Sequence, residues 1–231
     1  KWAKSQKIPV YYYISPQIWA WKESRIHQIK QTVSRMYCIL PFEKDFYMKH
    51  SLNVSYFGHP LLDEVNKFKL LNNNSLNLVN NRPVLAILPG SRKQEITKML
   101  AVMLSIIDDF KDYQFVIAGA PSQEFEFYEP FLNKQNIKFI SNKTYDLLSV
   151  SHAALVTSGT ATLETALFKV PEVVCYKGNQ ISYEIAKRII KLKYISLVNL
   201  ILDKEVVTEL IQSDFNKKRL KEELSNVLVD S

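Results

Sequence analysis

The chain has 231 residues, of which 47% are hydrophobic, and 30 Lys and Arg against 23 Asp and Glu give it a formal net charge of +7. This apolar content excludes a disordered chain, and the length suits one large domain or two modest ones. Two cysteines, Cys38 and Cys175, are too few for a disulfide framework or a zinc cluster and favour a reducing, intracellular compartment. The longest apolar stretch, 185–202, contains four basic residues, so we expect no membrane-spanning helix.

The positive charge has two interpretations. One is an anionic partner, such as nucleic acid, anionic lipid or a phosphorylated substrate, and the other is a Lys-rich surface that keeps the protein soluble. The sequence contains no RGG tract, basic arm or zinc-finger spacing, so we expect no nucleic-acid partner.

The first part of the chain begins abruptly. Residues 1–4 are typical of the last turn of a helix, and a β-branched and aromatic strand follows at 8–14. Because a domain rarely begins within a helix, we expect the chain to be a fragment that lacks its N-terminal part. The next predicted elements are a helix at 18–35, a strand at 37–40, a helix at 42–50 and a strand at 54–57.

An Asn-rich stretch within 66–82 is the best candidate for a linker, and a regular alternation of elements restarts after it. The predicted strands are 83–88, 115–119, 137–140, 153–157 and 172–176, and the predicted helices are 95–110, 145–150, 161–168 and 216–228. Apolar strands separated by helices indicate a parallel sheet covered on both faces. The sequence therefore predicts an α/β protein in two parts, 1–65 and 83–200, followed by C-terminal helices at 201–231.

Ligands of open parallel sheets bind at the carboxyl ends of the strands, where a loop leads into a helix. The first candidate loop contains Gly90, Ser91 and Arg92. Gly90 would let a ligand approach the backbone, Ser91 could cap the helix, and Arg92 could bind a phosphate or a carboxylate. An ordinary Ser cap beside a surface Arg explains the same residues equally well.

The second candidate loop lies at 157–164. Ser158, Gly159 and Thr160 would present free N–H groups at the positive end of a helix, which suits a phosphate or a diphosphate. Glu164, about one turn into the helix, would repel phosphate but could bind a ribose diol. The alternative is a capping box of Thr160 and Glu164, although these residues are four apart rather than three. The pair of loops favours a nucleotide sugar over a nucleoside triphosphate, because neither a Walker A nor a Gly-x-Gly-x-x-Gly pattern is present.

The remaining polar residues give weaker indications of a functional site. The four histidines show no metal-ligand spacing, and no nucleophilic triad can be assembled. His59, at the expected junction of the two parts, could face a cleft or serve as a structural hinge.

Six segments together resemble the lipid-A-disaccharide synthase family, the family 19 glycosyltransferases of the lipopolysaccharide pathway. The segments run in the family's order across nearly the whole chain, and the Ser-Pro-x-x-Trp-Ala-Trp and Gly-Ser-Arg patterns together are highly specific. They lie at 13–22 (YISPQIWAWK), 40–47 (LPFEKDFY), 57–60 (FGHP), 88–92 (LPGSR), 157–164 (TSGTATLE) and 186–199 (AKR followed by YISLVN).

The resemblance implies a GT-B fold of two Rossmann-like domains, the first incomplete in this chain and the second holding the nucleotide. The family is one of hexosyltransferases that move 2,3-diacylglucosamine from its UDP derivative to 2,3-diacylglucosamine 1-phosphate. The reaction inverts the anomeric carbon, forms the β-1,6 lipid A disaccharide and releases UDP, and it needs no cofactor and no metal. The resemblance also places the protein in the cytoplasm, at the inner face of the inner membrane.

The resemblance also assigns residues. Arg92 and the loop at 158–160 would neutralise the UDP diphosphate as it leaves, Glu164 would hold the ribose, and Asn199 would line the same pocket. The residue before Asn199 is Val198, where the family usually has Pro, so the local turn could differ. The family's Gly-Glu-x-Ser-Gly-Asp segment and its catalytic Asp, the proposed general base, are not in this chain. We therefore expect the chain to keep elements of the UDP site without turning over.

Trp19 and Trp21, with basic residues nearby, are typical of a helix that lies on a bilayer, from which acylated substrates would come. A pair of core tryptophans is equally consistent with the pattern.

Two alternatives to the transferase stay open. One is another GT-B enzyme that uses a UDP-sugar, such as an epimerase or a murein-pathway transferase, and the other is a non-catalytic UDP-binding module.

Overall fold

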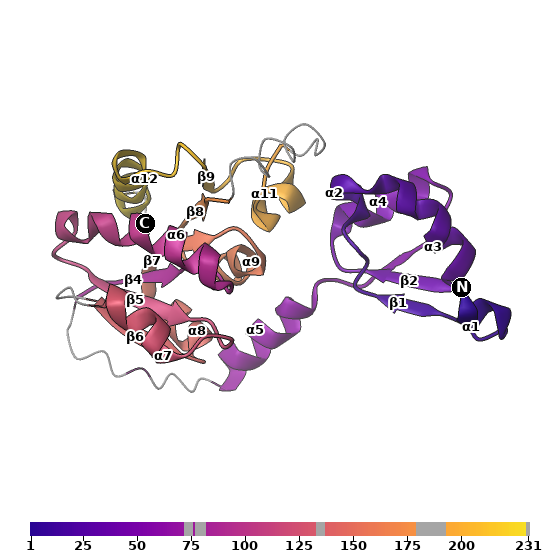
Figure 1. Ribbon diagram of the computed structural model, residues 1–231, viewed down its shortest axis with the longest axis horizontal. Coiled ribbons are helices and arrows are strands. Elements are labelled where there is room, and N and C mark those ends of the chain that lie inside the picture. Colours follow the sequence, from indigo (N-terminus) through magenta and orange to yellow (C-terminus); the bar gives the residue numbers. More distant parts are fainter. Residues whose placement is uncertain (72–75, 77–81, 133–136, 179–192, 230–231) are drawn as a thin grey trace. The chain divides into compact units, whose positions relative to one another are not determined.

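The computed structural model describes residues 1–71, 76, 82–132, 137–178 and 193–229 (Figure 1). The described residues form two compact units. The first unit is built mainly from Lys1–Glu64, and the second mainly from the described residues that follow it.

The first unit contains a three-stranded parallel sheet in the order β1-β2-β3. Its elements are α1 (Trp2–Ser5), β1 (Tyr11–Tyr13), α2 (Ile18–Trp21), η1 (Glu23–Arg25), α3 (Ile26–Thr32), β2 (Arg35–Cys38), α4 (Pro41–Lys49), β3 (Ser55–Tyr56) and the start of α5 (Pro60–Leu71). The single helix predicted at 18–35 is wrong, because the backbone leaves helical geometry at Lys22 (φ −143°, ψ 51°). Ile18, Ile26 and Ile29 are all buried and pack into the core of this unit.

The predicted linker at 66–82 is wrong at its start, because α5 remains helical to its last residue, Leu71. The later turns of α5 belong to the second unit. There the ring of Phe68 packs edge-on against Tyr145 and Phe168, with 5.7 Å between the ring centroids in each pair. This aromatic contact orders residues that sequence composition assigns to a loop. The Asn run at 72–74 lies outside the described residues.

The second unit contains a six-stranded parallel sheet in the order β6-β5-β4-β7-β8-β9. Its strands are β4 (Val84–Leu88), β5 (Gln114–Gly119), β6 (Ile137–Ser141), β7 (Ser151–Thr157), β8 (Glu172–Tyr176) and β9 (Thr208–Ile211). Its helices are α6 (Lys93–Met103), η2 (Leu104–Asp109), α7 (Phe125–Tyr128), η3 (Glu129–Phe131), α8 (Thr144–Leu148), α9 (Thr160–Leu167), α11 (Leu197–Leu202) and α12 (Lys217–Val229). The five strands predicted for this part are confirmed.

The central strands are apolar because both faces of the sheet are covered. In β4, Leu85 and Ile87 face the larger core with residues of α6 and α12. Ala86 and Leu88 face the opposite core with residues of α8. A strand with this pattern has no position for a polar functional side chain except at its ends.

The strand order defines one special position in this sheet. From β4 the chain moves outward through β5 to β6, then returns to β7 on the other side of β4 and continues through β8 to β9. This is the order of a dinucleotide-binding sheet, in which the crevice for ligands opens where the direction of winding reverses. Here the reversal lies between β4 and β7.

The prediction that 201–231 contains only helices is wrong, because β9 lies there and pairs in parallel with β8. The strand is short, and only Leu210 among its four residues is fully buried. Glu209 interrupts any apolar run. A strand of this kind at the edge of a sheet leaves little signal in the sequence.

The apolar stretch at 185–202 lies partly outside the described residues, and its last six residues form α11. Among the residues that the structure describes, no helix combines the length and the apolar character that crossing a bilayer requires.

Glu172, at the start of β8, is a buried carboxyl group. The side chain is 3% exposed, and neither of its oxygens has a hydrogen-bond partner among the residues that the structure describes. Burial raises the pKa of Glu172 to about 9. The folded protein therefore keeps this carboxyl group protonated at neutral pH, whereas the unfolded chain ionises it.

This difference makes stability depend on pH. Because the folded state holds a proton that the unfolded state has released above its ordinary pKa, stability should fall as pH rises from about 5 to about 8, by about 1.4 kcal/mol per pH unit from this residue. Urea unfolding at several pH values should show a shallower decline for Glu172→Gln than for the wild type. Glu205→Gln, at an exposed position, is the control and should follow the wild type. Equal slopes for Glu172→Gln and the wild type would contradict the assignment.

Candidate functional site

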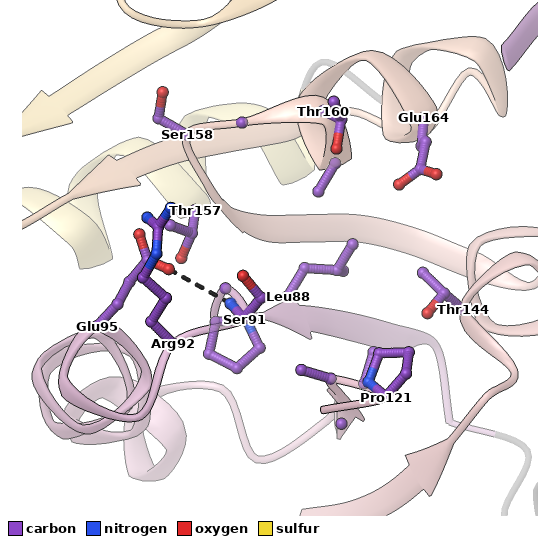
Figure 2. A pocket seen from close by; sticks show the side chains of 17 residues that line it. Leu88, Ser91, Arg92, Glu95, Pro121, Thr144, Thr157, Ser158, Thr160 and Glu164 are labelled. Carbon is purple, nitrogen blue, oxygen red and sulfur yellow. Dashed lines mark hydrogen bonds between the residues drawn. The ribbon is translucent and has the colours of Figure 1, made fainter. Parts of the chain in front are cut away.

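Two loops meet at the reversal of the sheet. Leu88, the last residue of β4, lies opposite Val156 of β7, so the loops that follow these strands begin side by side. Together with residues 118–121 and Thr144 they line a cavity of about 390 Å³, shown in Figure 2. Seven of the eight predicted site residues line it, namely Gly90, Ser91, Arg92, Ser158, Gly159, Thr160 and Glu164.

The first loop is held by a carboxylate. Gly90 has a φ of +102°, a backbone conformation that other residues rarely adopt, so this position favours glycine. A Cβ there would also lie 2.5 Å from Oε2 of Glu95, at the flexible end of that side chain. The same oxygen accepts a hydrogen bond from the backbone N–H of Ser91 at 3.3 Å, drawn dashed in Figure 2. The prediction that Ser91 caps α6 is wrong, because the N-cap residue is Arg92 and no side chain makes the cap hydrogen bond. Glu95 takes the stabilising role that the sequence suggested for Ser91.

The second loop leaves the start of α9 open. The N-cap residue is Gly159, no side chain makes the cap hydrogen bond, and the capping-box alternative is therefore wrong. Apart from Gly159 and its chain neighbours, no atom of the described residues lies within 4 Å of the position that a Cβ on Gly159 would occupy. The structure gives the N–H groups of Gly159, Thr160 and Ala161 no acceptor among the described residues. The positive end of this helix is therefore free to bind an anion.

Glu164 faces the cavity from one turn further along α9. Its Oε1 accepts a hydrogen bond from the hydroxyl of Tyr145 at 3.1 Å, which fixes the carboxyl group. Burial raises the pKa of Glu164, and the Tyr145 hydrogen bond opposes this shift. In Figure 2 Arg92 lies at one end of the cavity beside Thr157, and Glu164 lies toward the other end near Thr144. Arg92 and Glu164 therefore lie apart in the cavity, and the carboxyl group of Glu95 lies at the Arg92 end (Figure 2).

The prediction that Asn199 lines this cavity is wrong. The residue is fully buried, and its Nδ2 donates to the carbonyl of Val207 at 2.8 Å and to Oε1 of Glu209 at 2.9 Å. Its Oδ1 accepts hydrogen bonds from two backbone N–H groups, of Val206 and Val207, at 2.8 and 3.1 Å. The side chain thus joins α11 to β9 and has no free group for a ligand.

Asn199 still supports the site indirectly. Its partner Glu209 also accepts hydrogen bonds from the N–H groups of Ile195 and Ser196, each at 2.9 Å. The carbonyl of Ile195 in turn accepts the hydroxyl of Ser158 at 2.8 Å. The network therefore fixes the segment that holds Ser158 in place.

Several residues that line the cavity were not among the predicted site residues, and Thr157 is the most informative of them. Thr157 is 4% exposed and lines the cavity, and within the described part of the chain its Oγ1 has no hydrogen-bond partner. A buried hydroxyl without a partner is unusual and indicates a group that a ligand could satisfy. The signal in the sequence was a polar residue at the carboxyl end of an otherwise apolar strand.

His59 and Trp19 belong to the first unit. His59 lines a cavity of about 260 Å³ there, its Nδ1 accepts the N–H of Leu61 at 3.2 Å, and burial lowers its pKa. The indole of Trp19 donates to Oε1 of Glu43 at 3.1 Å, and its ring packs edge-on against Phe42. These contacts favour the core interpretation for Trp19. The side chain of Trp21 lies outside the described part of the structure.

Solved structures resemble the chain in fold. A UDP-GlcNAc 2-epimerase from Methanocaldococcus jannaschii, in complex with UDP-GlcNAc and UDP, has a TM-score of 0.64 at 16% identity, over 98% of this chain and 64% of that chain. The ADP-heptose lipopolysaccharide heptosyltransferase II of E. coli has a TM-score of 0.50 at 13% identity, over 99% of this chain and 72% of that chain. The chain is therefore an α/β protein of the GT-B type, with Rossmann-like parallel sheets.

Sequence comparison identifies the family. A model of the lipid-A-disaccharide synthetase family matches residues 1–231. The lipid-A-disaccharide synthase of Syntrophus aciditrophicus is 39% identical over 235 residues, which cover 98% of this chain and 61% of that protein. That of Coxiella burnetii is 37% identical over 234 residues, which cover 99% of this chain and 62% of that protein. The chain belongs to the lipid-A-disaccharide synthetase family and spans about three fifths of the length of these relatives.

The structural role of Asn199 is tested by measuring the free energy of unfolding. Asn199→Ala leaves the N–H groups of Val206 and Val207 without their acceptor, so the free energy of unfolding should fall by about 2 to 4 kcal/mol. Asn226→Ala, at an exposed position of α12, should change it by less than about 0.5 kcal/mol. Urea unfolding of the two variants makes the comparison, and an equally small effect of both would contradict a structural role.

Proposed function

We propose that this chain contributes the UDP-binding part of a hexosyltransferase. The reaction moves 2,3-diacylglucosamine from its UDP derivative to 2,3-diacylglucosamine 1-phosphate, forms the β-1,6 lipid A disaccharide and releases UDP. The observation that carries the proposal is the cavity at the reversal of the sheet, which is lined by the free N-terminus of α9, by Arg92 and by Glu164. The names of the related synthases support the same reaction.

The diphosphate of UDP is assigned to the start of α9. The unpaired N–H groups of Gly159, Thr160 and Ala161 would donate to the phosphate oxygens, and the guanidinium of Arg92 would bind them from the opposite loop. Negative charge builds up on the diphosphate as the bond to the sugar breaks. Fixed donors placed at that position stabilise the transition state more than the bound substrate. No residue of this chain is assigned as the general base.

The ribose is assigned to Glu164. A carboxylate accepts hydrogen bonds from two adjacent hydroxyl groups, and Tyr145 holds this one in a fixed orientation. Its negative charge would oppose a phosphate in the same position, which keeps the diphosphate toward the Arg92 end. The two ends of the cavity therefore fix the direction in which UDP lies.

The epimerase alternative has less support. Epimerase structures resemble this chain only at the level of the fold, with 16% identity or less among those compared. The synthases are 35 to 39% identical over almost the whole chain. The acyl chains of both proposed substrates partition into a bilayer, so the transferase would act as a peripheral protein at the inner-membrane surface, in the cytoplasm.

The site is tested by calorimetry with UDP and with inorganic pyrophosphate. Arg92→Ala should weaken the binding of both ligands about tenfold, because it removes a charge-assisted hydrogen bond to phosphate. Glu164→Ala should weaken UDP binding by a similar factor and leave the affinity for pyrophosphate unchanged, because pyrophosphate has no ribose. Lys204→Ala, an exposed lysine, controls for the loss of one positive charge.

Two results would contradict this assignment. Pyrophosphate binding that weakens with Glu164→Ala would place the carboxyl group beside the phosphates. UDP binding that is unaffected by Arg92→Ala would mean that the diphosphate does not bind to this loop. The reaction itself is tested on the whole protein by UDP release, which should require both acylated substrates, whereas an epimerase would form the 2-epimer of a UDP-sugar without an acceptor.

A further inference from the structure

A second cavity, of about 360 Å³, adjoins the proposed UDP pocket and is far more basic. It lies between the start of α6 and the residues that follow β8. The charged residues that line it are Arg92, Lys93, Lys98, Lys177 and Glu95. The UDP pocket, in contrast, is lined by one cation, Arg92, and two carboxyl groups, Glu95 and Glu164. The positive charge of this region is therefore concentrated beside the nucleotide pocket rather than within it.

Among the described residues that line the basic cavity, four cations face one carboxyl group, that of Glu95. Neither Lys98 nor Lys177 forms an ion pair with a carboxylate in the part of the chain that the structure describes, whereas Lys217 and Lys221 on α12 both pair with Asp109. The carboxylate of Glu95 is engaged by a backbone N–H group of the Gly90 loop. Like charges held around one hollow repel each other, and an anion in the hollow relieves that repulsion.

We propose that the basic cavity is a second anion site, which binds the phosphate group of a ligand other than the nucleotide. Lysine side chains bind phosphate as mobile point charges, and the volume suits a small phosphorylated molecule. Because Arg92 lines both cavities, the two anions would lie on either side of one guanidinium group. Two molecules could carry the phosphate, a sugar 1-phosphate or an anionic lipid headgroup. Naming the sugar 1-phosphate rests on the proposed function, in which the acceptor carries this group.

The test uses the 231-residue chain and two phosphate probes. Glucosamine 1-phosphate is titrated by calorimetry in the presence of saturating UDP, and vesicles of phosphatidylglycerol or of phosphatidylcholine are used for co-sedimentation. The variant is the double substitution Lys98→Gln and Lys177→Gln. The matched control is Lys111→Gln with Lys204→Gln, two exposed lysines outside the cavity whose loss changes the net charge equally.

The proposal expects at least one probe to bind in the presence of UDP and to weaken about tenfold in the cavity variant. UDP affinity should change less than about twofold, and the control pair should affect neither probe by more than that factor. Weakening of glucosamine 1-phosphate identifies a sugar phosphate as the source, and weakening of phosphatidylglycerol vesicles alone identifies a lipid headgroup.

Three results would overturn the proposal. UDP binding that weakens as strongly as probe binding would assign Lys98 and Lys177 to the nucleotide site. Competition between UDP and the bound probe would show one shared anion site. Probe binding that is equal in the cavity variant and the control would make the cavity an ordinary basic surface. If UDP does not bind while the probe does, the proposed function fails and the anion site stands.

Discussion

The parallel pairing of β4 with β7 is the constraint from which the site follows. These strands are neighbours in the sheet but lie far apart in sequence, because the chain first winds outward through β5 and β6 and then returns. Each strand is apolar along its length, since helices cover both faces of the sheet. Polar groups are therefore confined to the loops at the carboxyl ends, and the reversal leaves these two loops with open space between them.

The sequence predicted this part of the fold well, because the signals are local. The five strands of the second unit are apolar runs bounded by turns, and the two loops show Gly90 and Gly159 directly after such runs. The extent of α5 could not be predicted, since it depends on Phe68 packing against rings that lie much later in the chain. Strand β9 is too short and too polar to stand out from the loop sequence around it.

The error at Asn199 has the same origin. An Asn beside a predicted pocket has the chemistry of a ligand contact, and only the tertiary structure shows that all its hydrogen-bonding groups are already used. Thr157 is the opposite case, since the sequence placed it in the candidate loop at 157–164 without giving it a role, yet its hydroxyl has no hydrogen-bond partner among the described residues. For both residues the decisive fact is whether the protein itself satisfies the polar group.

The distribution of charge links the two cavities. A diphosphate could not bind to the UDP pocket through side-chain charge alone, because Glu95 and Glu164 outnumber Arg92 there. The hydrogen bond from the Ser91 N–H to Glu95 reduces this repulsion, and the open start of α9 supplies fixed positive ends of peptide dipoles. The lysines beyond Arg92 raise the potential further, but only within about 8 Å at physiological salt. Among the described residues that line the two cavities, Arg92 is the cation common to both, so it is the residue that would contact a nucleotide on one side and a second phosphate on the other.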